Sequence, residues 1–196
     1  MTRYTMLGDR ALRFARPHGA SPRALVDAVR AWPGVVDVVI AKSDIAAYFD
    51  REPAIDEEQL VALDTLETDT GVAREIELPA IYDGPDLDDV ARAISRSTDD
   101  VRALHAATVF VVETMGFAPG FAYLAGLPEV LQLPRRATPR PRVPAGSLAI
   151  AAAYSAVYPF DSPGGWHLIG RVPVAMFGPD GARLQLGDRV RFVEVR

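Results

Sequence analysis

The feature that most constrains this chain is the stretch of residues 116–171, which combines many glycines and prolines with four closely spaced arginines. Glycine permits positive φ, whereas proline holds φ at about −65° and lacks a backbone donor. A segment dense in both cannot form a regular helix or a long regular strand, so we expect shaped loops between short strands. Loops on a rigid scaffold commonly carry binding and catalytic residues. We therefore predict the functional site here, although any single turn also fits a plain corner of a β-barrel.

The composition excludes several classes of site. The 196 residues, of which 49% are hydrophobic, suffice for one or two small domains with true cores. The absence of cysteine excludes disulfides, thiolate metal sites and a cysteine nucleophile. The single lysine, Lys42, is not part of a Gly-Lys-Ser/Thr phosphate-binding loop. An anion recognised by this chain must therefore be held by arginine, backbone N–H groups or a partner chain.

Charge and hydropathy limit the partners. The formal net charge of −5 argues against nucleic acid as a partner. The first residues lack the apolar core and cleavage site of a signal peptide, and no apolar run approaches the length of a membrane span. We expect a cytoplasmic protein with no membrane partner. The three histidines are too scattered to indicate a metal site, so none is predicted.

The first half of the chain alternates strand and helix patterns. Ser21 predicts a helix N-cap with Pro22 in the first turn, and a second helix over residues 56–66 begins with acidic residues that suit the helix dipole. Residues 74–78 alternate in polarity and end at a proline, so we assign them as the last strand of this unit. This order predicts a small two-layer α+β domain over residues 1–78.

The second half has a different pattern. Helices are predicted over residues 86–94 and 98–106. The strand candidates that follow cover residues 108–112, 147–153, 166–169, 173–177 and 189–195. Many short strands joined by long Pro/Gly loops indicate a closed or nearly closed β-barrel. The predicted fold class is α+β, with the small N-terminal domain followed by a β-barrel domain over residues 79–196.

Two arginines in the central stretch are candidates for anion binding. The surrounding prolines force the segment RRATPRPR to be extended, so the side chains of Arg140 and Arg142 should point the same way. Two guanidinium groups on one face would clamp a carboxylate or a phosphate. The alternative is a solvated basic loop or a patch that meets an acidic partner.

A second candidate is the segment SPGGW. Ser162 lies outside any Gly-x-Ser-x-Gly elbow and has no acid–base partner nearby in sequence, so we expect it to act through hydrogen bonding. Gly164 and Gly165 allow backbone N–H groups to converge on an anion. A tight turn is the alternative.

Aromatic and histidine side chains complete the candidates. Phe117 and Phe121 share one Gly/Pro loop and either line a pocket wall or pack beneath the loop. Tyr158 offers its hydroxyl to a ligand. His167 is a candidate general acid–base. His105 lies near the end of a helix, where a structural role competes with proton transfer.

Three segments carry a resemblance to a known family: GFAPGFAYLAGL, RRATPRPRVPAGSLAIA and YPFDSPGGWHLIGR. They resemble the family of 5-oxoprolinase B subunits, also described as allophanate hydrolase subunit 1 or the Kip-type sporulation kinase inhibitor. The likeness extends to GDRAL near the N-terminus and to the terminal GDRVRF, and so covers nearly the whole chain.

The resemblance implies a cyclophilin-like fold for the β-barrel domain. It implies two partners, the 5-oxoprolinase A subunit and a second cyclophilin-like chain, which is the C subunit or allophanate hydrolase subunit 2. The assembly would open a small cyclic amide, 5-oxo-L-proline, to L-glutamate with water and with ATP, which brings Mg²⁺. Related domain pairs occur in the carboxyltransferase part of urea carboxylase.

Within that reaction we expect Arg140 and Arg142 to clamp an anion. Ser162 and the two glycines would hold an oxyanion or phosphate, and His105 or His167 would move protons. The chain is expected to be inactive alone. The alternatives are a hydrolase component that acts on allophanate or urea, and a non-catalytic inhibitor of a histidine kinase.

Overall fold

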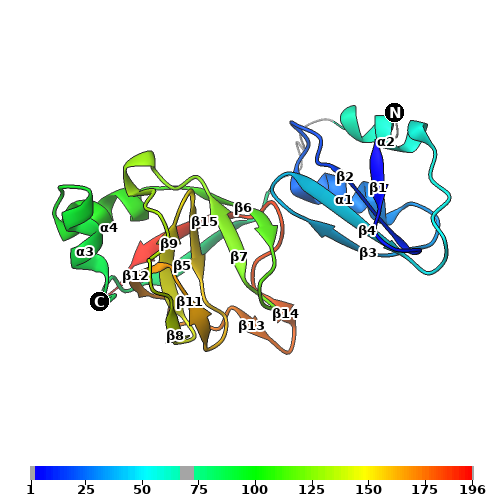
Figure 1. The fold of residues 1–196 in the computed structure, drawn as a ribbon. Coiled ribbons are helices and arrows are strands. Elements are labelled where there is room, and N and C mark those ends of the chain that lie inside the picture. The colour runs from blue at the N-terminus through cyan, green and yellow to red at the C-terminus, as the bar shows by residue number, and fades with distance from the viewer. Residues whose placement is uncertain (1–2, 67–72, 196) are drawn as a thin grey trace. The chain divides into compact units, whose positions relative to one another are not determined.

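A computed structural model describes residues 3–66 and 73–195 of the chain. The chain divides into two compact units, Met1–Val72 and Ala73–Arg196, and Figure 1 shows both as ribbons. The boundary falls before the predicted one between residues 78 and 79. The strand that we assigned to the end of the first unit belongs to the second.

The N-terminal unit is an antiparallel sheet with two helices. Its elements are β1 (Tyr4–Met6), β2 (Ala11–Ala15), α1 (Pro22–Arg30), β3 (Val35–Ile40), β4 (Asp44–Phe49) and α2 (Glu57–Asp64). The strand order is β1-β2-β4-β3, with antiparallel neighbours throughout. Both helices begin at capped residues, because Ser21 Oγ accepts from the Ala24 N–H at 3.1 Å and Asp56 forms a reciprocal capping box with Gln59.

The C-terminal unit is built on a seven-stranded sheet in the order β12-β9-β10-β7-β6-β15-β5, with two short ribbons, β8-β11 and β13-β14. Its elements are β5 (Glu75–Ala80), α3 (Leu87–Ala93), α4 (Thr98–Ala106), β6 (Phe110–Met115), β7 (Ala122–Ala125), the 3₁₀ turn η1 (Glu129–Leu131), β8 (Arg140–Val143), β9 (Ser147–Ala151), β10 (Tyr154–Val157), β11 (Ser162–Gly164), β12 (His167–Arg171), β13 (Phe177–Gly178), β14 (Gly181–Ala182) and β15 (Arg189–Glu194).

The sheet closes nearly into a barrel. β5 pairs in parallel with β15, which explains why it belongs to this unit. Just beyond β5, Ile81 exchanges both backbone hydrogen bonds with Arg171 at the end of β12, at 2.9 and 2.8 Å. The backbones meet so closely that a Cβ on Gly170 would lie 2.3 Å from the Ile81 carbonyl oxygen, and one on Gly84 would lie 2.3 Å from that of Leu168. Glycine is required at both positions of this seam.

The two helices of this unit cover one end of the barrel and complete its core. α3 contacts α4 and β12, and α4 contacts β15; Figure 1 shows the two helices side by side. Val90 and Val101 are fully buried against barrel residues such as Phe110 and Phe192. Burial of these apolar side chains stabilises the helix–barrel contact.

Strand β9 separates two layers of buried side chains. All five of its residues are buried. Leu148 and Ile150 belong to the barrel core, whereas Ala149 and Ala151 pack in a second cluster with aromatic residues. Because successive strand residues point to opposite faces, the aromatic cluster lies on the other side of the sheet from the barrel core.

The predicted fold class is confirmed, and the differences are local. The predicted strand over 173–177 is present only at Phe177–Gly178. Strands β7 and β10 were not predicted as separate elements, because Pro/Gly-rich or alanine-rich neighbours mask their short alternation. No helix within the described residues has the length and apolar character needed to cross a bilayer.

Candidate functional site

A small aromatic pocket forms over the second cluster, with a volume of about 80 Å³. Five of the predicted binding residues line it. The lining consists of Phe117, Phe121, Tyr123, Arg135, Tyr158, Pro163, Gly164, Gly165 and Trp166. The central Pro/Gly-rich stretch therefore brings together residues that are far apart along the chain. Their ligand-binding roles stay predictions, but their spatial convergence is a property of the fold.

The loop between β6 and β7 supplies one wall of the pocket. Phe117 adopts φ 71°, which is unusual for a residue with a side chain, and Gly120 adopts φ 78°. Phe117 is 62% exposed, yet its ring lies edge-on to Phe121 at 5.3 Å and to Tyr158 at 6.4 Å between centroids. A strained backbone thus presents an exposed ring at the pocket mouth, an arrangement common at functional sites.

The floor of the pocket is a set of edge-to-face aromatic rings. The Phe121 ring lies 5.0 Å from Tyr123, 5.4 Å from Tyr158 and 5.7 Å from Trp166, measured between centroids. Such pairs prefer T-shaped geometry, and each adds to the free energy of area burial. The floor is therefore a rigid apolar surface that suits a small flat ring.

Gly164 is required beside Tyr158. A Cβ on Gly164 would lie 2.2 Å from the Tyr158 hydroxyl oxygen. Burial raises the pKa of Tyr158, against the opposing effect of a hydrogen bond from the Trp166 backbone N–H. The hydroxyl is therefore protonated and neutral at pH 7.

Arg135 is the cationic side chain of the pocket, and we did not single it out from the sequence. It is exposed, and within residues 3–66 and 73–195 it makes no side-chain hydrogen bond or ion pair. Its neighbours are held in place. The Pro134 carbonyl pairs with His167 Nε2 at 2.9 Å, and the Arg136 N–H donates to the Gly165 carbonyl at 2.8 Å.

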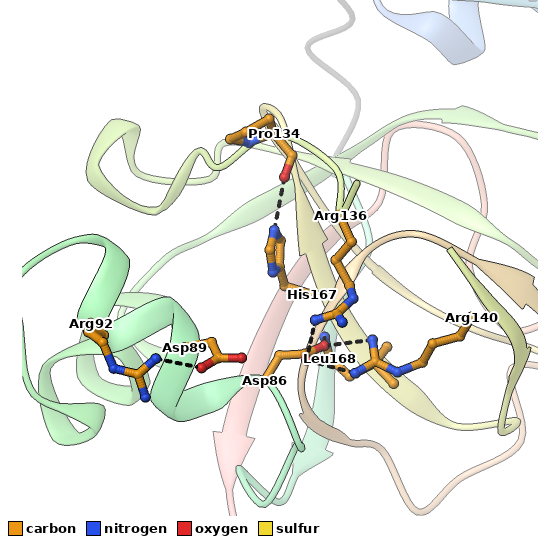
Figure 2. Close-up of polar contacts among 8 residues, drawn as sticks. All are labelled: Asp86, Asp89, Arg92, Pro134, Arg136, Arg140, His167 and Leu168. Carbon is orange, nitrogen blue, oxygen red and sulfur yellow. Dashed lines mark hydrogen bonds and ion pairs between the residues drawn. The ribbon is translucent and has the colours of Figure 1, made fainter. Parts of the chain in front are cut away.

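A buried carboxylate anchors the same segment from the other side (Figure 2). Asp86 is 1% exposed and accepts four hydrogen bonds. Arg136 Nη1 donates at 2.7 Å, Arg140 donates through Nη1 at 2.9 Å and Nη2 at 2.7 Å, and the Leu168 N–H donates at 2.7 Å. Burial by itself raises the pKa of Asp86, but the hydrogen bonds from Arg140 and Leu168 and the arginine charges outweigh it, so the pKa is lowered. The carboxylate is ionised and fully paired.

Arg140 and Arg142 do not form a joint clamp. Arg142 donates from Nε and Nη2 to Asp161 at 2.8 and 2.5 Å, whereas Arg140 binds Asp86. A backbone hydrogen bond from Ala145, followed by that from Arg142, lowers the pKa of Asp161. The segment is extended as predicted, but the two guanidinium groups reach different carboxylates, and neither lines the aromatic pocket. The expectation that they face one shared anion is corrected.

Two predicted polar residues lie beside the pocket but outside its lining. Ser162 opens β11 and pairs with Val143 of β8. His167 opens β12, and its Nε2 faces the Pro134 carbonyl, so it holds the segment that carries Arg135 (Figure 2). Their predicted catalytic roles stay predictions, and the observed contacts give both residues a role in building the site.

His105 lies in the barrel core. It is 0% exposed, with Tyr82 Oη 2.9 Å from Nδ1 and Ser155 Oγ 2.8 Å from Nε2. Burial lowers its pKa to about 3, so the ring is neutral at pH 7. The neighbouring rings of Phe110 and Phe192 lie 4.9 Å away between centroids. This environment corrects the expectation that His105 reaches a substrate and favours its structural role.

A larger cavity of about 510 Å³ lies elsewhere on this unit. Its walls are Glu75, Ile76, Glu77, Val109, Arg189 and Arg191. Its acidic residues lie on β5 and its arginines on the parallel strand β15, and Arg189 Nε lies 3.6 Å from Glu75 Oε1. It contains none of the predicted site residues, so we assign the functional site to the aromatic pocket. Among the described residues, no group of three or more potential ligands is placed to hold a metal ion.

Comparisons with known proteins agree with the resemblance seen in the sequence. The family model described as carboxyltransferase domain, subdomain C and D, matches residues 2–186. The B subunit of 5-oxoprolinase from Haemophilus influenzae is 41% identical over 170 residues, which cover 81% of this chain and 79% of that protein. The Bacillus subtilis protein of the same name is 42% identical over 62% of this chain, and the match spans about half, 53%, of that relative's length.

Solved structures extend the comparison. The crystal structure of TTHA0988 matches with a TM-score of 0.81 and 37% identity, over 95% of this chain but only 40% of that one. The urea amidolyase of K. lactis matches with a TM-score of 0.70 over 98% of this chain and 15% of that one. At 17% identity, this second likeness concerns the fold alone.

Proposed function

This chain belongs to the family of carboxyltransferase domains, subdomain C and D, and on that basis we propose that it acts as the B subunit of an ATP-dependent 5-oxoprolinase complex. The names of its relatives support this role. The observation that carries it is the aromatic pocket, which places a flat apolar floor next to the Arg135 guanidinium group, unpaired among the described residues. That combination suits a small cyclic amide.

The size of the pocket indicates which of the two substrates, the lactam or ATP, it binds in this proposal. A volume of about 80 Å³ is well below the range of about 300–1,000 Å³ that is typical for larger ligands. It suits a five-membered ring and is too small for a nucleotide. In this proposal, ATP and its Mg²⁺ are bound elsewhere in the complex, and the lactam site is completed by a partner chain.

The proposed chemistry compensates for the poor reactivity of a lactam. ATP transfers its terminal phosphoryl group to the lactam oxygen, and water then attacks the activated carbon. Cleavage of the C–N bond releases the amine and leaves an acyl phosphate, which a second water hydrolyses, so that one lactam, one ATP and two waters give glutamate, ADP and phosphate. Phosphoryl transfer depends mainly on positioning and charge neutralisation. The contribution of this chain is to hold and orient the ring, and the phosphate is neutralised by groups of the complex.

The proposed partners are a second cyclophilin-like chain, the C subunit, and the A subunit of the complex. The described residues that line the pocket include no carboxylate and no histidine to serve as a general base. A partner side chain at the open mouth, next to Phe117, would supply the missing acid–base group. The isolated chain is therefore inactive in this proposal.

Reconstitution tests the proposal. The chain is combined with its partner subunits and supplied with 5-oxo-L-proline, urea or allophanate, while glutamate or ammonia and ADP are measured. We expect ATP-dependent glutamate formation from 5-oxoproline by the complex and none by the isolated chain. Turnover of urea or allophanate in place of 5-oxoproline, or turnover by the chain alone, would refute the proposal.

A further inference from the structure

We propose that Arg135 is the specificity-determining residue of the aromatic pocket and that it binds a carboxylate carried by the ring of the substrate. This inference rests on the proposed function, because it assigns the group that selects a carboxylated lactam over a neutral one. It also assigns to Asp86 the role of a positioning residue that acts through Arg136, the neighbour of Arg135 in the chain.

The charge of the pocket favours an anionic ligand. Of the described residues that line the pocket, only Arg135 is charged, and Tyr158 is held neutral by burial. The other three arginines of the segment are paired, Arg136 and Arg140 with Asp86 and Arg142 with Asp161. A carboxylate at the pocket would therefore find Arg135 without having to displace an existing ion pair. A planar guanidinium donates two parallel hydrogen bonds to a carboxylate.

The size of the pocket limits what carries that carboxylate. Its floor consists of aromatic rings, and its volume of about 80 Å³ accepts a single small ring. A flat apolar floor contributes hydrophobic contact to any such ring, whether charged or not. Discrimination must then come from the polar group at the edge. We therefore expect Arg135 to determine the preference for carboxylated rings, and the aromatic residues to determine the affinity for small rings in general.

The anchors of the segment explain how an exposed side chain can be selective. Pro134 is held by His167, and Arg136 is held both by the Gly165 carbonyl and by Asp86. The anchors connect the segment to β11 and β12, the strands on either side of Gly165 and Trp166 of the pocket. Arg136 is fixed to Gly165 of the pocket lining, and Pro134 is fixed to His167 beside it. Because both neighbours of Arg135 are fixed, little conformational freedom of its backbone is lost when a ligand binds.

A binding experiment on the full chain tests the inference independently of catalysis. The affinity of the purified chain is measured by titration for 5-oxo-L-proline, for cyclopentanecarboxylate, which lacks the amide, and for 2-pyrrolidinone, which lacks the carboxylate. Arg135→Ala is compared with the wild type, and Arg92→Ala serves as a control that removes an exposed arginine paired with Asp89 on α3.

We expect Arg135→Ala to weaken binding of both carboxylates by about 10- to 100-fold, the range for charge-assisted hydrogen bonds. Binding of 2-pyrrolidinone should stay within about twofold in this variant, the scale of a surface change without direct contact. Arg92→Ala should leave all three affinities unchanged. Equal losses for all three ligands, or no loss for any, would overturn the inference.

The role of Asp86 is tested in the same assay with Asp86→Asn, which retains the size of the side chain. Asp86→Asn should weaken 5-oxoproline binding in the wild-type background and have little further effect beside Arg135→Ala, because both changes act on one contact. Binding of 2-pyrrolidinone should be unaffected. Additive losses, or an equal loss for the neutral ring, would contradict a positioning role.

The outcomes also separate this inference from the proposed function. If the reconstituted complex turns over 5-oxoproline while Arg135→Ala retains the preference for carboxylated rings, the inference fails and the proposed function stands. If the complex turns over no lactam, the proposed function fails, whatever the pocket binds.

Discussion

Two polar clusters link the helical segment to the barrel, one around Asp86 and one around His105. The buried group at the centre of the first is charged, whereas that of the second is neutral. Asp86, at the start of α3, is ionised and binds Arg136 and Arg140. His105, in the last turn of α4, is neutral and shares hydrogen bonds with Tyr82 and Ser155. Both side chains are buried, at 1% and 0% exposure. Burial alone therefore does not decide whether a group is charged.

The difference lies in the partners. The two arginine side chains around Asp86 remain 30% and 25% exposed, so the ion pairs keep contact with water while their carboxylate is buried. The surroundings of His105 are hydroxyls and aromatic rings, which stabilise a neutral imidazole but not a cation. The charged cluster organises the site, and the neutral cluster stabilises the core.

The pH dependence of stability should show the largest effect, and it tests the neutral cluster. Because the folded-state pKa of His105 is about 3 and the ordinary value is about 6.5, the unfolded chain binds a proton between these values that the folded chain does not. The contribution of His105 to the free energy of unfolding is fully present above pH 6.5, and it is lost progressively as the pH falls toward 3. The expected loss is about 1.4 kcal/mol per pH unit, or about 3 kcal/mol between pH 7 and pH 4.

Urea unfolding at a series of pH values measures this loss, with His105→Phe as the reference that cannot titrate. The variant should be less stable than the wild type at pH 7, because Tyr82 and Ser155 lose a partner, but its stability should depend less on pH between 4 and 6.5. Identical pH slopes for the two proteins would show that His105 is not the neutral core histidine described above.

Substitution of Asp86 tests the charged cluster. Asp86→Ala should lower the free energy of unfolding by about 3 kcal/mol, at the lower end for breaking a buried ion pair because the arginines can still be hydrated. Asp89→Ala is the matched control on the same helix, since its ion pair with Arg92 is exposed. The control should cost less than about 1 kcal/mol. Similar losses from both substitutions in chemical denaturation would remove the distinction between buried and exposed carboxylates.

Alanine substitutions at Gly164 and Gly165 test the packing of the pocket without changing a residue of either polar cluster. Gly164→Ala should displace the Tyr158 hydroxyl, which would lie 2.2 Å from the new Cβ, and destabilise the chain by about 1–3 kcal/mol through overpacking. Gly165→Ala is milder, because its Cβ would meet Pro139 at an ordinary 3.6 Å. Thermal unfolding and ring binding should rank the variants in this order, and the reverse order would contradict the packing at Tyr158.

The exposed ion pair between Arg142 and Asp161 should show the smallest effect. Its side chains are 77% and 44% exposed, so Arg142→Ala should change the free energy of unfolding by about 0.5 kcal/mol or less. In the lactam assay this variant should lose less affinity than Arg135→Ala. A larger loss at Arg142 would restore the anion-binding role that its position in the sequence suggested.

Local features of the fold could be read from the sequence. The caps at Ser21 and Asp56 satisfy donors within three residues of themselves, so local sequence determines them. The extended form of the segment around Arg140 follows in the same way from its prolines. These predictions required no knowledge of tertiary contacts.

The domain boundary, the pairing of the arginines and the burial of His105 could not be predicted, because they depend on contacts between residues far apart in the sequence. Residues 74–78 alternate like any half-buried strand, and only the pairing of β5 with β15 assigns them to the second unit. Arg135 and Arg140 belong to one arginine-rich segment, but Asp86, which lies 54 residues before Arg140, pairs with Arg140, whereas Arg135 has no ion pair within the described part of the chain. The spacing of the arginines along the segment does not indicate which of them pairs with Asp86. His105 was ambiguous because a helix position does not reveal how deeply the helix end is buried.

The most direct test of the central claim uses the two tryptophans of the chain. Trp166 lines the pocket, whereas Trp32 packs against Phe14 in the N-terminal unit, so their indole N–H signals provide a probe and an internal reference. Titration of the ¹⁵N-labelled chain with 5-oxo-L-proline should shift the Trp166 signal and leave that of Trp32 in place, and Arg135→Ala should abolish the shift at the same ligand concentration. An unmoved Trp166 signal at saturating ligand, or an equal shift in the Arg135→Ala variant, would contradict the account.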